Sequence, residues 1–401
     1  MHNYTEPARS VRISGSFDVV VVGGGIAGVA AAIAAARSGA SVCVIEKQYA
    51  LGGLATLGLV VIYLPICDGN GRQVCGGLAE ELLWLAAQDG AATVPSCWHQ
   101  GGDPDARTRT RYAVEFNPTS YLLAVEQCLL GLGVTLLYDT RCCAAIGEDR
   151  VDALVVENKG GRSAVECRAV VDCTGDADVC ALVGEPTTSL RTNVAAGWYY
   201  SLIDGKPRLH KISEPFDAAG ASVLPGARRG FAGEDEWDVT AQIVASRSMI
   251  REHQSELRKE HPDASVLPFL VPTYPGFRMT RRLVAPVEFS AVDGKEYDDS
   301  VGLISDWRRR GPVYSVPLRA IRAVRHSNLF VAGRCISATG TGWDQTRVIP
   351  PCVVTGEAAG TACAMIATGQ TLADTRGVHA LQDRLRDGGS RLFLKDIEGL
   401  Q

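Results

Sequence analysis

A glycine-rich turn between a buried strand and an alanine-rich helix is the feature that most constrains what this chain can fold into. Residues 17–22 (FDVVVV) are mostly β-branched and apolar, which predicts a buried parallel strand. The turn at 23–28 (GGGIAG) leads into a predicted helix at 29–38, which Gly39 ends, and a second strand is predicted at 40–45. These pieces form a βαβ unit, which predicts an α/β fold around a parallel sheet.

The spacing within and after this turn is typical of dinucleotide binding. Gly23, Gly25 and Gly28 fit GxGxxG, and Glu46 ends the second strand, 18 residues after Gly28. Glycines let backbone N–H groups approach a pyrophosphate at a helix N-terminus, and a carboxylate at that distance accepts from an adenosine ribose hydroxyl. An isolated GxGxxG is weak evidence and can be a structural turn, but here the strand, the helix and the acid agree. We therefore expect a bound dinucleotide.

The residues after Glu46 favour FAD over NAD. Lys47 follows directly, and a second glycine pair, Gly52-Gly53, suits a loop that passes close to another part of the cofactor. In an NAD domain another helix and strand would follow, whereas residues 58–111 are irregular apart from one short predicted helix.

Composition and charge exclude several other classes of protein. The chain of 401 residues has a net charge of −5 and a pI near 5.9, which argues against nucleic-acid binding. Its thirteen cysteines include no CxxC pair, so we expect no metal site. Residues 1–16 lack the apolar core of a signal peptide, and the uncharged stretch 19–36 is too rich in glycine and alanine for a membrane span. We expect a cytoplasmic protein with reduced cysteines, in which the vicinal Cys142–Cys143 lies on a strand with alternating faces.

Further elements follow from the apolar patterns. Helices are predicted at 78–87, 118–130, 239–259 and 352–368, and strands at 134–138, 141–146, 151–157, 163–167, 169–172 and 328–332.

The order of these elements predicts one domain interrupted by another. Between 186 and 312 the pattern changes to strands and loops around a single long helix, and afterwards the doubly wound pattern returns. We therefore expect a Rossmann-like FAD-binding domain of residues 1–185 and 313–401, with an inserted α+β substrate domain at 186–312.

Seven segments in this order resemble a known family. They are VVVVGGGIAGVAAAIAAARSGASVCVIEK, LGGLAT, VVDCTGDADVCALVG, FRMTRRLVAPVEF, VYSVPLRAI, NLFVAGRCISAT and RVIPPCVVTGEAAGTA, within residues 17–366. The first is shared by many flavoproteins, but together they are specific. The chain resembles the FAD-dependent oxidoreductases of the glutathione-reductase-like superfamily, distantly related to fumarate reductase flavoproteins.

The resemblance implies which residues contact FAD. The first glycine turn would hold the pyrophosphate, Glu46 the adenosine ribose, and the backbone near Cys143 the adenine. The residues from 347 onward would face the isoalloxazine, because the N-terminus of the following helix stabilises negative charge at N1 and O2. The expected contacts are Gly23, Gly25, Ile26, Ala27, Gly28, Glu46, Lys47, Gly52, Gly53, Cys143, Thr174, Gly175, Asp176, Gly333, Arg334, Arg347, Val348 and Ile349.

The chain also departs from its relatives in ways that bear on the chemistry. No histidine follows Gly52-Gly53, where some fumarate reductase relatives attach the flavin, so we expect non-covalent FAD. The family's histidine after the AGRCISAT segment is missing, since residues 340–346 read GTGWDQT. No second GxGxxG and no CxxxxC occur, so the NADPH domain and the disulfide of glutathione reductase are absent.

Arginines near the end of the expected insertion are candidates for binding an anionic substrate. Residues 278–325 contain ten basic and six acidic residues, although the whole chain is acidic. Within this segment an R-x-x-RR motif ends in Arg281 and Arg282, which we expect to bind the substrate; the alternative is an ion pair between domains.

Further residues are candidates for chemistry at the flavin. Possible proton donors are Tyr63, Tyr274, Tyr314 and His99, although each alone more often serves packing. Asp344 either lines the site or only closes a turn.

These features predict an FAD-dependent dehydrogenase or reductase. Its substrate is a small organic molecule, bound between FAD and the inserted domain, and it needs an external electron donor or acceptor. Two alternatives remain: a flavin-dependent hydroxylating enzyme that uses oxygen, and an electron-transfer subunit without a substrate pocket. The sequence predicts no oligomeric state.

Overall fold

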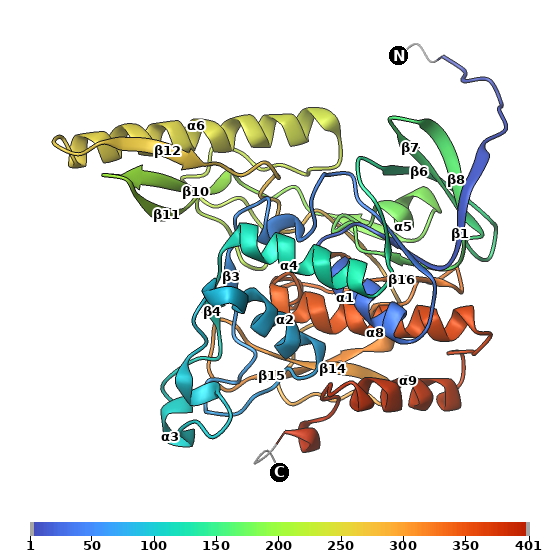
Figure 1. The fold of residues 1–401 in the computed structure, drawn as a ribbon. Coiled ribbons are helices and arrows are strands. Elements are labelled where there is room, and N and C mark those ends of the chain that lie inside the picture. Colours follow the sequence, from blue (N-terminus) through green and yellow to red (C-terminus); the bar gives the residue numbers. More distant parts are fainter. Residues whose placement is uncertain (1–3, 398–401) are drawn as a thin grey trace.

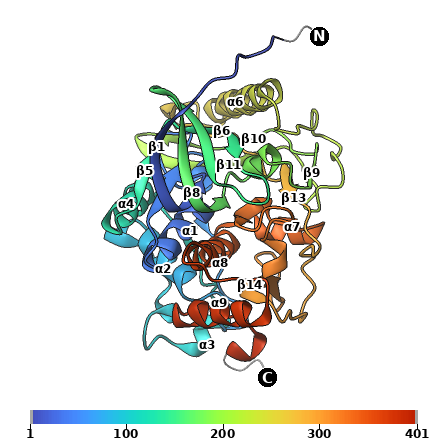
Figure 2. The same cartoon turned by 90° about the vertical axis from the view of Figure 1, so that its right-hand side faces the viewer.

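The computed structural model describes residues 4–397, so the first three residues of the segment 1–16 lie outside the described part. Its centre is a parallel sheet in which β1 pairs with β2 on one side and β8 on the other (Figures 1 and 2). The order of the parallel strands is β5 (Thr135–Leu137), β2 (Val42–Ile45), β1 (Arg12–Val22), β8 (Gly161–Asp172) and β16 (Leu329–Val331). The predicted mixed α/β fold with a parallel sheet is confirmed.

Two small-residue helices pack closely against each other beside this sheet. They are α1 (Ile26–Arg37) and α8 (Ile349–Ala367), which lie side by side in both views (Figures 1 and 2). A Cβ on Gly356 would lie 2.3 Å from the Ala27 carbonyl oxygen, so the two backbones meet where no side chain fits. Among the described helices, α8 alone has the length and apolarity of a membrane span, and 89% of that span is buried inside the protein.

An antiparallel meander extends the sheet. β6 (Arg141–Ile146) pairs with β7 (Ala153–Asn158), and β7 pairs with the first half of β8. The two strands predicted at 163–167 and 169–172 are one continuous strand, because β1 pairs with β8 on both sides of Arg168. All thirteen cysteines are free, and the register of β6 shifts between Cys142 and Ala144.

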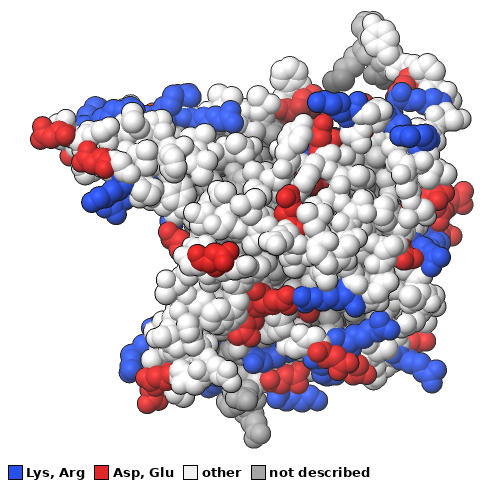
Figure 3. All heavy atoms as spheres, viewed as in Figure 1, with Lys and Arg blue, Asp and Glu red and all other residues white. Residues whose placement is uncertain are grey.

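A second sheet lies beside a long helix and forms an arm at the upper left of Figure 1. Its strands are β11 (Lys206–Ser213), β10 (Ala196–Ile203) and β12 (Val266–Leu270). The helix is α6 (Glu236–Glu260), which begins where the Asp235 side chain accepts from the Asp238 N–H, and its buried residues recur at helical spacing. Lys and Arg gather along the outer edge of this arm in Figure 3.

Two short pairings bound this arm in the chain. β9 (Thr187–Ser189) pairs with β13 (Arg281–Leu283) where the chain leaves the first sheet and returns to it. β14 (Ser300–Ser305) and β15 (Val313–Pro317) then form a hairpin that contacts α8, so the expected boundary at 312 falls between its strands. The division into domains stays a prediction, and this hairpin connects the two sides of the expected boundary.

The remaining elements are short, apart from two helices. They are α2 (Leu78–Ala86), α3 (Pro104–Arg107), α4 (Pro118–Gly131), α5 (Asp178–Leu182), α7 (Thr341–Thr346), α9 (Thr375–Asp387), β3 (Ile62–Tyr63) and β4 (Val114–Glu115). The helix α9 is not among the predicted elements, although Asp374 caps it and Gly377, Leu381 and Leu385 recur on its buried face.

Candidate active site

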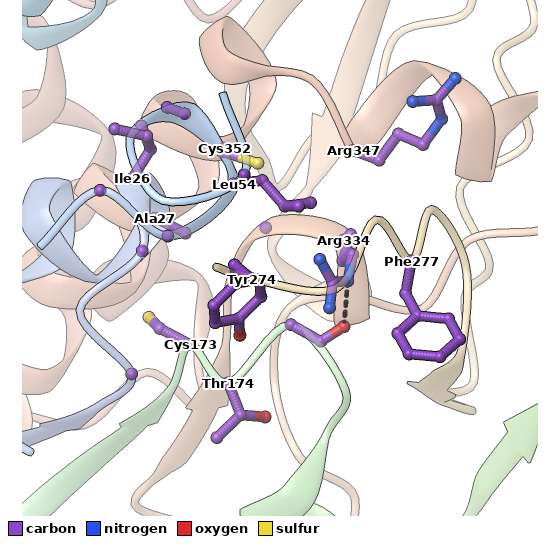
Figure 4. A pocket seen from close by; sticks show the side chains of 18 of the residues that line it. Ile26, Ala27, Leu54, Cys173, Thr174, Tyr274, Phe277, Arg334, Arg347 and Cys352 are labelled. Atoms are coloured by element: carbon purple, nitrogen blue, oxygen red, sulfur yellow. Dashed lines mark hydrogen bonds between the residues drawn. The ribbon is translucent and has the colours of Figure 1, made fainter. Parts of the chain in front are cut away.

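A cavity of about 550 Å³ lies where the parallel strands end at their carboxyl edge. Residues at or just beyond the ends of β1, β2, β8 and β16 line one side, as expected for ligand sites in parallel sheets. The opposite side is formed by Ala196–Trp198 of β10 and by residues between 272 and 281. In Figure 4, Ile26 and Ala27 lie on one side and Arg347 and Phe277 on the other. The volume is within the range of small-molecule and cofactor sites.

The three glycines of the first turn have three different surroundings. A Cβ on Gly23, whose φ is +101°, would lie 2.5 Å from the Cys173 carbonyl oxygen, so Gly23 permits the tight turn. A Cβ on Gly28 would lie 1.9 Å from the Gly23 carbonyl oxygen, so Gly28 permits α1 to pack on the turn. A Cβ on Gly25 would meet nothing within 4 Å, because Gly25 borders the cavity. Gly25 therefore leaves open the space that a ligand would fill.

The N-terminus of α1 opens into this space. Gly25 is its N-cap and no side chain caps the helix, so N–H groups of its first turn are free to bind an anion. Ile26 and Ala27, the first two helical residues, both line the cavity. The second glycine pair lies against the same turn, because the Gly52 N–H donates to the Gly24 carbonyl at 2.8 Å.

Glu46 lies at the end of β2 and is buried. One carboxylate oxygen accepts from the Gly24 N–H at 2.6 Å, and the other accepts from the Gln48 N–H at 2.7 Å. A carboxylate oxygen can accept more than one hydrogen bond, so Glu46 can hold the glycine turn and still bind a hydroxyl in the cavity.

Arg334 joins the loops that follow β8 and β16. Its Nε donates to the Gly175 carbonyl at 2.7 Å, as drawn in Figure 4, and its Nη2 donates to Asp176 at 2.8 Å. Burial raises the pKa of Asp176, but Arg334 and Lys47 lower that pKa more, so the carboxylate stays charged. Gly175 and Arg334 line the cavity, whereas Asp176 lies behind them.

A second titratable group faces the same part of the cavity. Burial and the nearby Asp176 raise the pKa of Asp178 to about 6. Lys47 lies 5.7 Å from the centre of the Tyr274 ring, and Tyr274 raises the pKa of this lysine, which therefore stays protonated.

The N-terminus of α8 lies at the far end. Arg347, Val348 and Ile349 line the cavity there, and no side chain caps the helix. Pro350 and Pro351 have no N–H, so the Ile349 N–H is the donor that the first three helical residues offer. An uncapped helix N-terminus at this place favours negative charge in the cavity.

Comparison with known proteins identifies the family. A model of the family described as FAD dependent oxidoreductase matches residues 18–196 and 204–385. The chain belongs to this family. Its cofactor is FAD, and the protein is an FAD-dependent oxidoreductase. The predicted relation to glutathione reductase and fumarate reductase stays a prediction.

Individual relatives of this oxidoreductase are distant. A thioredoxin reductase of Ureaplasma parvum serovar 3 is 39% identical over 69 residues, which are 17% of this chain and 22% of that reductase. This match therefore spans about a fifth of the relative's length. The structure of a geranylgeranyl bacteriochlorophyll reductase-like protein from Thermoplasma acidophilum is similar over 95% of this chain and 86% of that protein's chain, with 13% sequence identity and a TM-score of 0.46. The structure of p-nitrophenol 4-monooxygenase from Pseudomonas putida DLL-E4 is similar over 94% of this chain and 89% of that enzyme's chain, with 14% sequence identity and a TM-score of 0.45.

The cavity fits FAD by its own geometry. The open position at Gly25 and the uncapped first turn of α1 suit a pyrophosphate, and the uncapped α8 suits the electron-rich edge of a flavin. Most of the residues expected to contact FAD line the cavity; they are Gly23, Gly25, Ile26, Ala27, Glu46, Lys47, Gly52, Gly53, Thr174, Gly175, Gly333, Arg334, Arg347, Val348 and Ile349. Their contacts with FAD stay predictions.

Three of the expected FAD contacts do not border the cavity. Gly28 supports helix packing, and Asp176 is paired with Arg334. Cys143 does not line the cavity, whereas its neighbour Cys142 does, because neighbouring residues of β6 face opposite sides.

Tyr63 has no access to the cavity. It is fully buried, and its hydroxyl donates to the Ala79 carbonyl at 2.6 Å. Its neighbours Ile62 and Leu64 line the cavity instead, as the alternation of an extended chain requires. The prediction of Tyr63 as a proton donor at the flavin is wrong, and the tyrosine is a packing residue.

Asp344 is not a free acid or base. It is 2% exposed and accepts from two guanidinium groups, with distances of 2.6 Å to Arg308 Nε and 2.7 Å to Arg347 Nη2. It does not border the cavity, so the prediction that it acts on the substrate is wrong. Asp344 instead holds Arg347, which does.

Arg281 and Arg282 are neighbours on β13, so their side chains point to opposite faces of the strand. Arg282 is buried, pairs with Glu288 at 2.6 Å and lies 5.3 Å from the Trp343 ring, away from the cavity. Its predicted contact with substrate is therefore wrong. Arg281 borders the cavity but pairs with Asp178 at 2.7 Å and donates to the Asp176 carbonyl. Arg281 thus joins β13 to the loop after β8.

Much of the opposite wall comes from β10 and from the segment after β12. Trp198 and Phe277 of this wall were not predicted from the sequence, whereas Tyr274 was a possible proton donor and Arg278 is the first arginine of the R-x-x-RR motif. The R-x-x-RR motif did indicate this segment, but it did not show which of its arginines faces inward.

We expect Glu46→Ala to weaken FAD binding about 10- to 150-fold, since a hydrogen bond to a charged group contributes roughly 1.5–3 kcal/mol. The variant also leaves the N–H groups of Gly24 and Gln48 without their acceptors. Titration of the apoprotein with FAD, followed by flavin fluorescence, measures the change. Glu148→Ala, at an exposed position in the β6–β7 turn, is the matched control. Equal dissociation constants for Glu46→Ala and the control would contradict this assignment.

Proposed function

We propose that this oxidoreductase transfers a hydride between FAD and a small organic substrate. The substrate binds between the flavin and the wall formed by β10 and residues 272–281. The observation that carries the proposal is the single continuous cavity, which is lined by the βαβ unit, by the N-terminus of α8 and by this wall. FAD supplies the hydride-accepting or hydride-donating atom when it is bound.

The lining supports one orientation of FAD in the cavity. The adenosine would lie beside Glu46 and residues 140–142, and the pyrophosphate beside Gly25 and the N-terminus of α1. The isoalloxazine would then reach residues 347–349, where the uncapped helix end and the Arg347 guanidinium favour an electron-rich ring edge.

The chain's own groups argue against thiolate chemistry beside the flavin. Cys352 lines the cavity in the first turns of α8, but burial raises the pKa of its thiol to about 12. The thiol therefore stays protonated near neutral pH and is a poor nucleophile. No histidine lines this cavity in the described part of the chain, which supports non-covalent binding of FAD. We also propose a cytoplasmic location, an external electron donor or acceptor, and no nucleic-acid or membrane partner.

Anaerobic reduction of the bound flavin tests this function. Holoenzyme is mixed without oxygen with a library of small organic metabolites, with NADH and with NADPH, and the visible flavin absorbance is followed. Bleaching by an organic compound, with stoichiometric oxidised product, is expected for a dehydrogenase. For a reductase, chemically reduced enzyme is reoxidised by the organic compound without oxygen.

Two results would overturn the proposal. Reduction by NAD(P)H only, followed by an oxygenated product in air, indicates a hydroxylating enzyme. Exchange of electrons with redox proteins and with no small molecule indicates an electron-transfer subunit.

A further inference from the structure

Arg278 is a half-buried arginine of the cavity wall whose guanidinium pairs with no carboxylate of residues 4–397. Its Nη2 donates to the Ser213 hydroxyl at 2.9 Å, and its guanidinium lies 3.9 Å from the centre of the Phe216 ring. Its Nη1 is buried and has no hydrogen-bond partner in the described part of the chain. Burying an unpaired charge is unfavourable unless an acceptor binds it.

Three of the other four arginines that line the cavity each have an acid: Arg281 pairs with Asp178, Arg334 with Asp176 and Arg347 with Asp344. The fourth, Arg141, is exposed to water, which can solvate its charge. Arg278 therefore differs from the three paired arginines in lacking internal compensation, and it borders the cavity beside Gly276 and Phe277.

The surroundings of Arg278 are positive. Arg308 and Arg347 share the one carboxylate of Asp344, so this group keeps a net positive charge before Arg278 is added. Burial and, after it, the nearby Arg347 and Arg308 lower the pKa of Arg278 to about 9, although Asp344 partly opposes them. An anion in the cavity would relieve this repulsion and supply the missing acceptor.

The shape of the site favours a planar anion. Phe216 lies over one face of the guanidinium, so an anion approaches its edge, where a guanidinium can offer a pair of parallel N–H groups and where Nη1 has no partner among the described residues. A carboxylate accepts such a pair of hydrogen bonds with both oxygens. The same cavity is also lined by Phe277 and Trp198, which suit the apolar part of an organic acid.

We propose that Arg278 binds a carboxylate group of the substrate, so that the substrate is an organic acid. This inference rests on the proposed function, because it places the acid between the flavin and the β10 wall. Arg278 touches the substrate away from the hydride-transferring atom, and it orients the substrate.

Binding of simple carboxylates to the FAD-loaded enzyme tests the proposal. Acetate, benzoate and succinate are each titrated against acetamide, benzamide and succinamide, and perturbation of the visible flavin spectrum gives the dissociation constant. At least one carboxylate is expected to bind the wild type more tightly than its amide. Arg278→Gln is expected to weaken that binding about 10- to 150-fold, the range for hydrogen bonds to charged groups.

Two further variants separate the guanidinium's shape from charge in general. Arg278→Lys keeps the charge but not the fork, so it is expected to weaken binding less than Arg278→Gln. Arg251→Gln removes an arginine from an exposed position of α6 and is expected to change nothing. If Arg278→Gln does not fold, the carboxylate dissociation constant of Arg278→Lys is compared with that of Arg251→Gln instead.

Three outcomes would overturn the proposal. They are equal carboxylate binding by the wild type and the Arg278 variants, equal binding of acids and amides by the wild type, and loss of FAD from both Arg278 variants. The last result would assign Arg278 to the cofactor or to the fold. A wild-type protein that carries no FAD is instead a failure of the proposed function, and it is seen before any carboxylate is added.

Discussion

Gly25→Val is expected to give a folded protein that no longer retains FAD, whereas Gly28→Val is expected not to fold. A side chain at Gly25 enters the open space at the N-terminus of α1, where the pyrophosphate would lie. At Gly28 the Cβ would lie 1.9 Å from the Gly23 carbonyl oxygen, so α1 would have to move away from the turn. Ordinary overpacking destabilises by about 1–3 kcal/mol, and contact with a fixed backbone atom at this distance costs more.

Circular dichroism, thermal unfolding and the flavin absorbance of the purified variants distinguish the two effects. Gly131→Ala is the control, since a Cβ there meets nothing within 4 Å and lies at the end of α4. Gly25→Val should reduce FAD content more than Glu46→Ala does. Retention of full FAD by Gly25→Val would show that the cofactor does not use this turn, and a stable fold for Gly28→Val would contradict the packing role of Gly28.

Asp344→Ala is expected to lower the free energy of unfolding by about 3 kcal/mol, the lower part of the range for breaking a buried ion pair. The change leaves two guanidinium groups without their shared carboxylate, and Arg347 is only 15% exposed. Because Arg308 is partly exposed, water compensates part of the loss at that residue.

Urea unfolding of the apoprotein measures this difference without interference from FAD. Asp383→Ala is the matched control, because Asp383 pairs with Arg386 at the surface and is 71% exposed. Its expected effect is below about 0.5 kcal/mol. Unchanged stability of Asp344→Ala combined with lost activity would restore the catalytic assignment that the sequence suggested.

The glycine turn shows how far the sequence could predict this molecule. Gly23, Gly25 and Gly28 were expected together at a pyrophosphate, and the strand, helix and acid around them follow the expected order. This worked because the constraint on Gly28 is local: its Cβ would meet Gly23 of the same turn. Gly23 meets Cys173, which is distant in the sequence, and Gly25 borders open space. Their separate surroundings, however, became visible only in the folded chain.

The errors in predicting which side chains face the cavity have a different physical cause. Tyr63, Cys143 and Arg282 each lie next to a residue that lines the cavity, and a shift of one residue in an extended chain reverses the direction of a side chain. Motifs placed the right segments but did not fix which residues face inward. That choice depends on long-range pairing, such as that of β13 with β9.

The end of the inserted segment and the special position of Arg278 could not be predicted either, because both follow from contacts between residues distant in the sequence. The hairpin of β14 and β15 contacts α8 and crosses the boundary expected at 312, and its loop gave no sign of this in the sequence. Arg278 is distinguished from its neighbours only by the absence of an acid beside it, which no spacing in the chain can reveal.

The central claim is that the cavity between the βαβ unit and the β10 wall holds FAD without a covalent bond. The most direct test is to denature the purified protein with acid, remove the chain, and measure the flavin in solution by absorbance and chromatography. About one FAD for each chain is expected in solution, with a colourless pellet. Flavin that stays with the denatured chain would contradict non-covalent binding, and a protein that binds NAD tightly and no flavin would contradict the whole account.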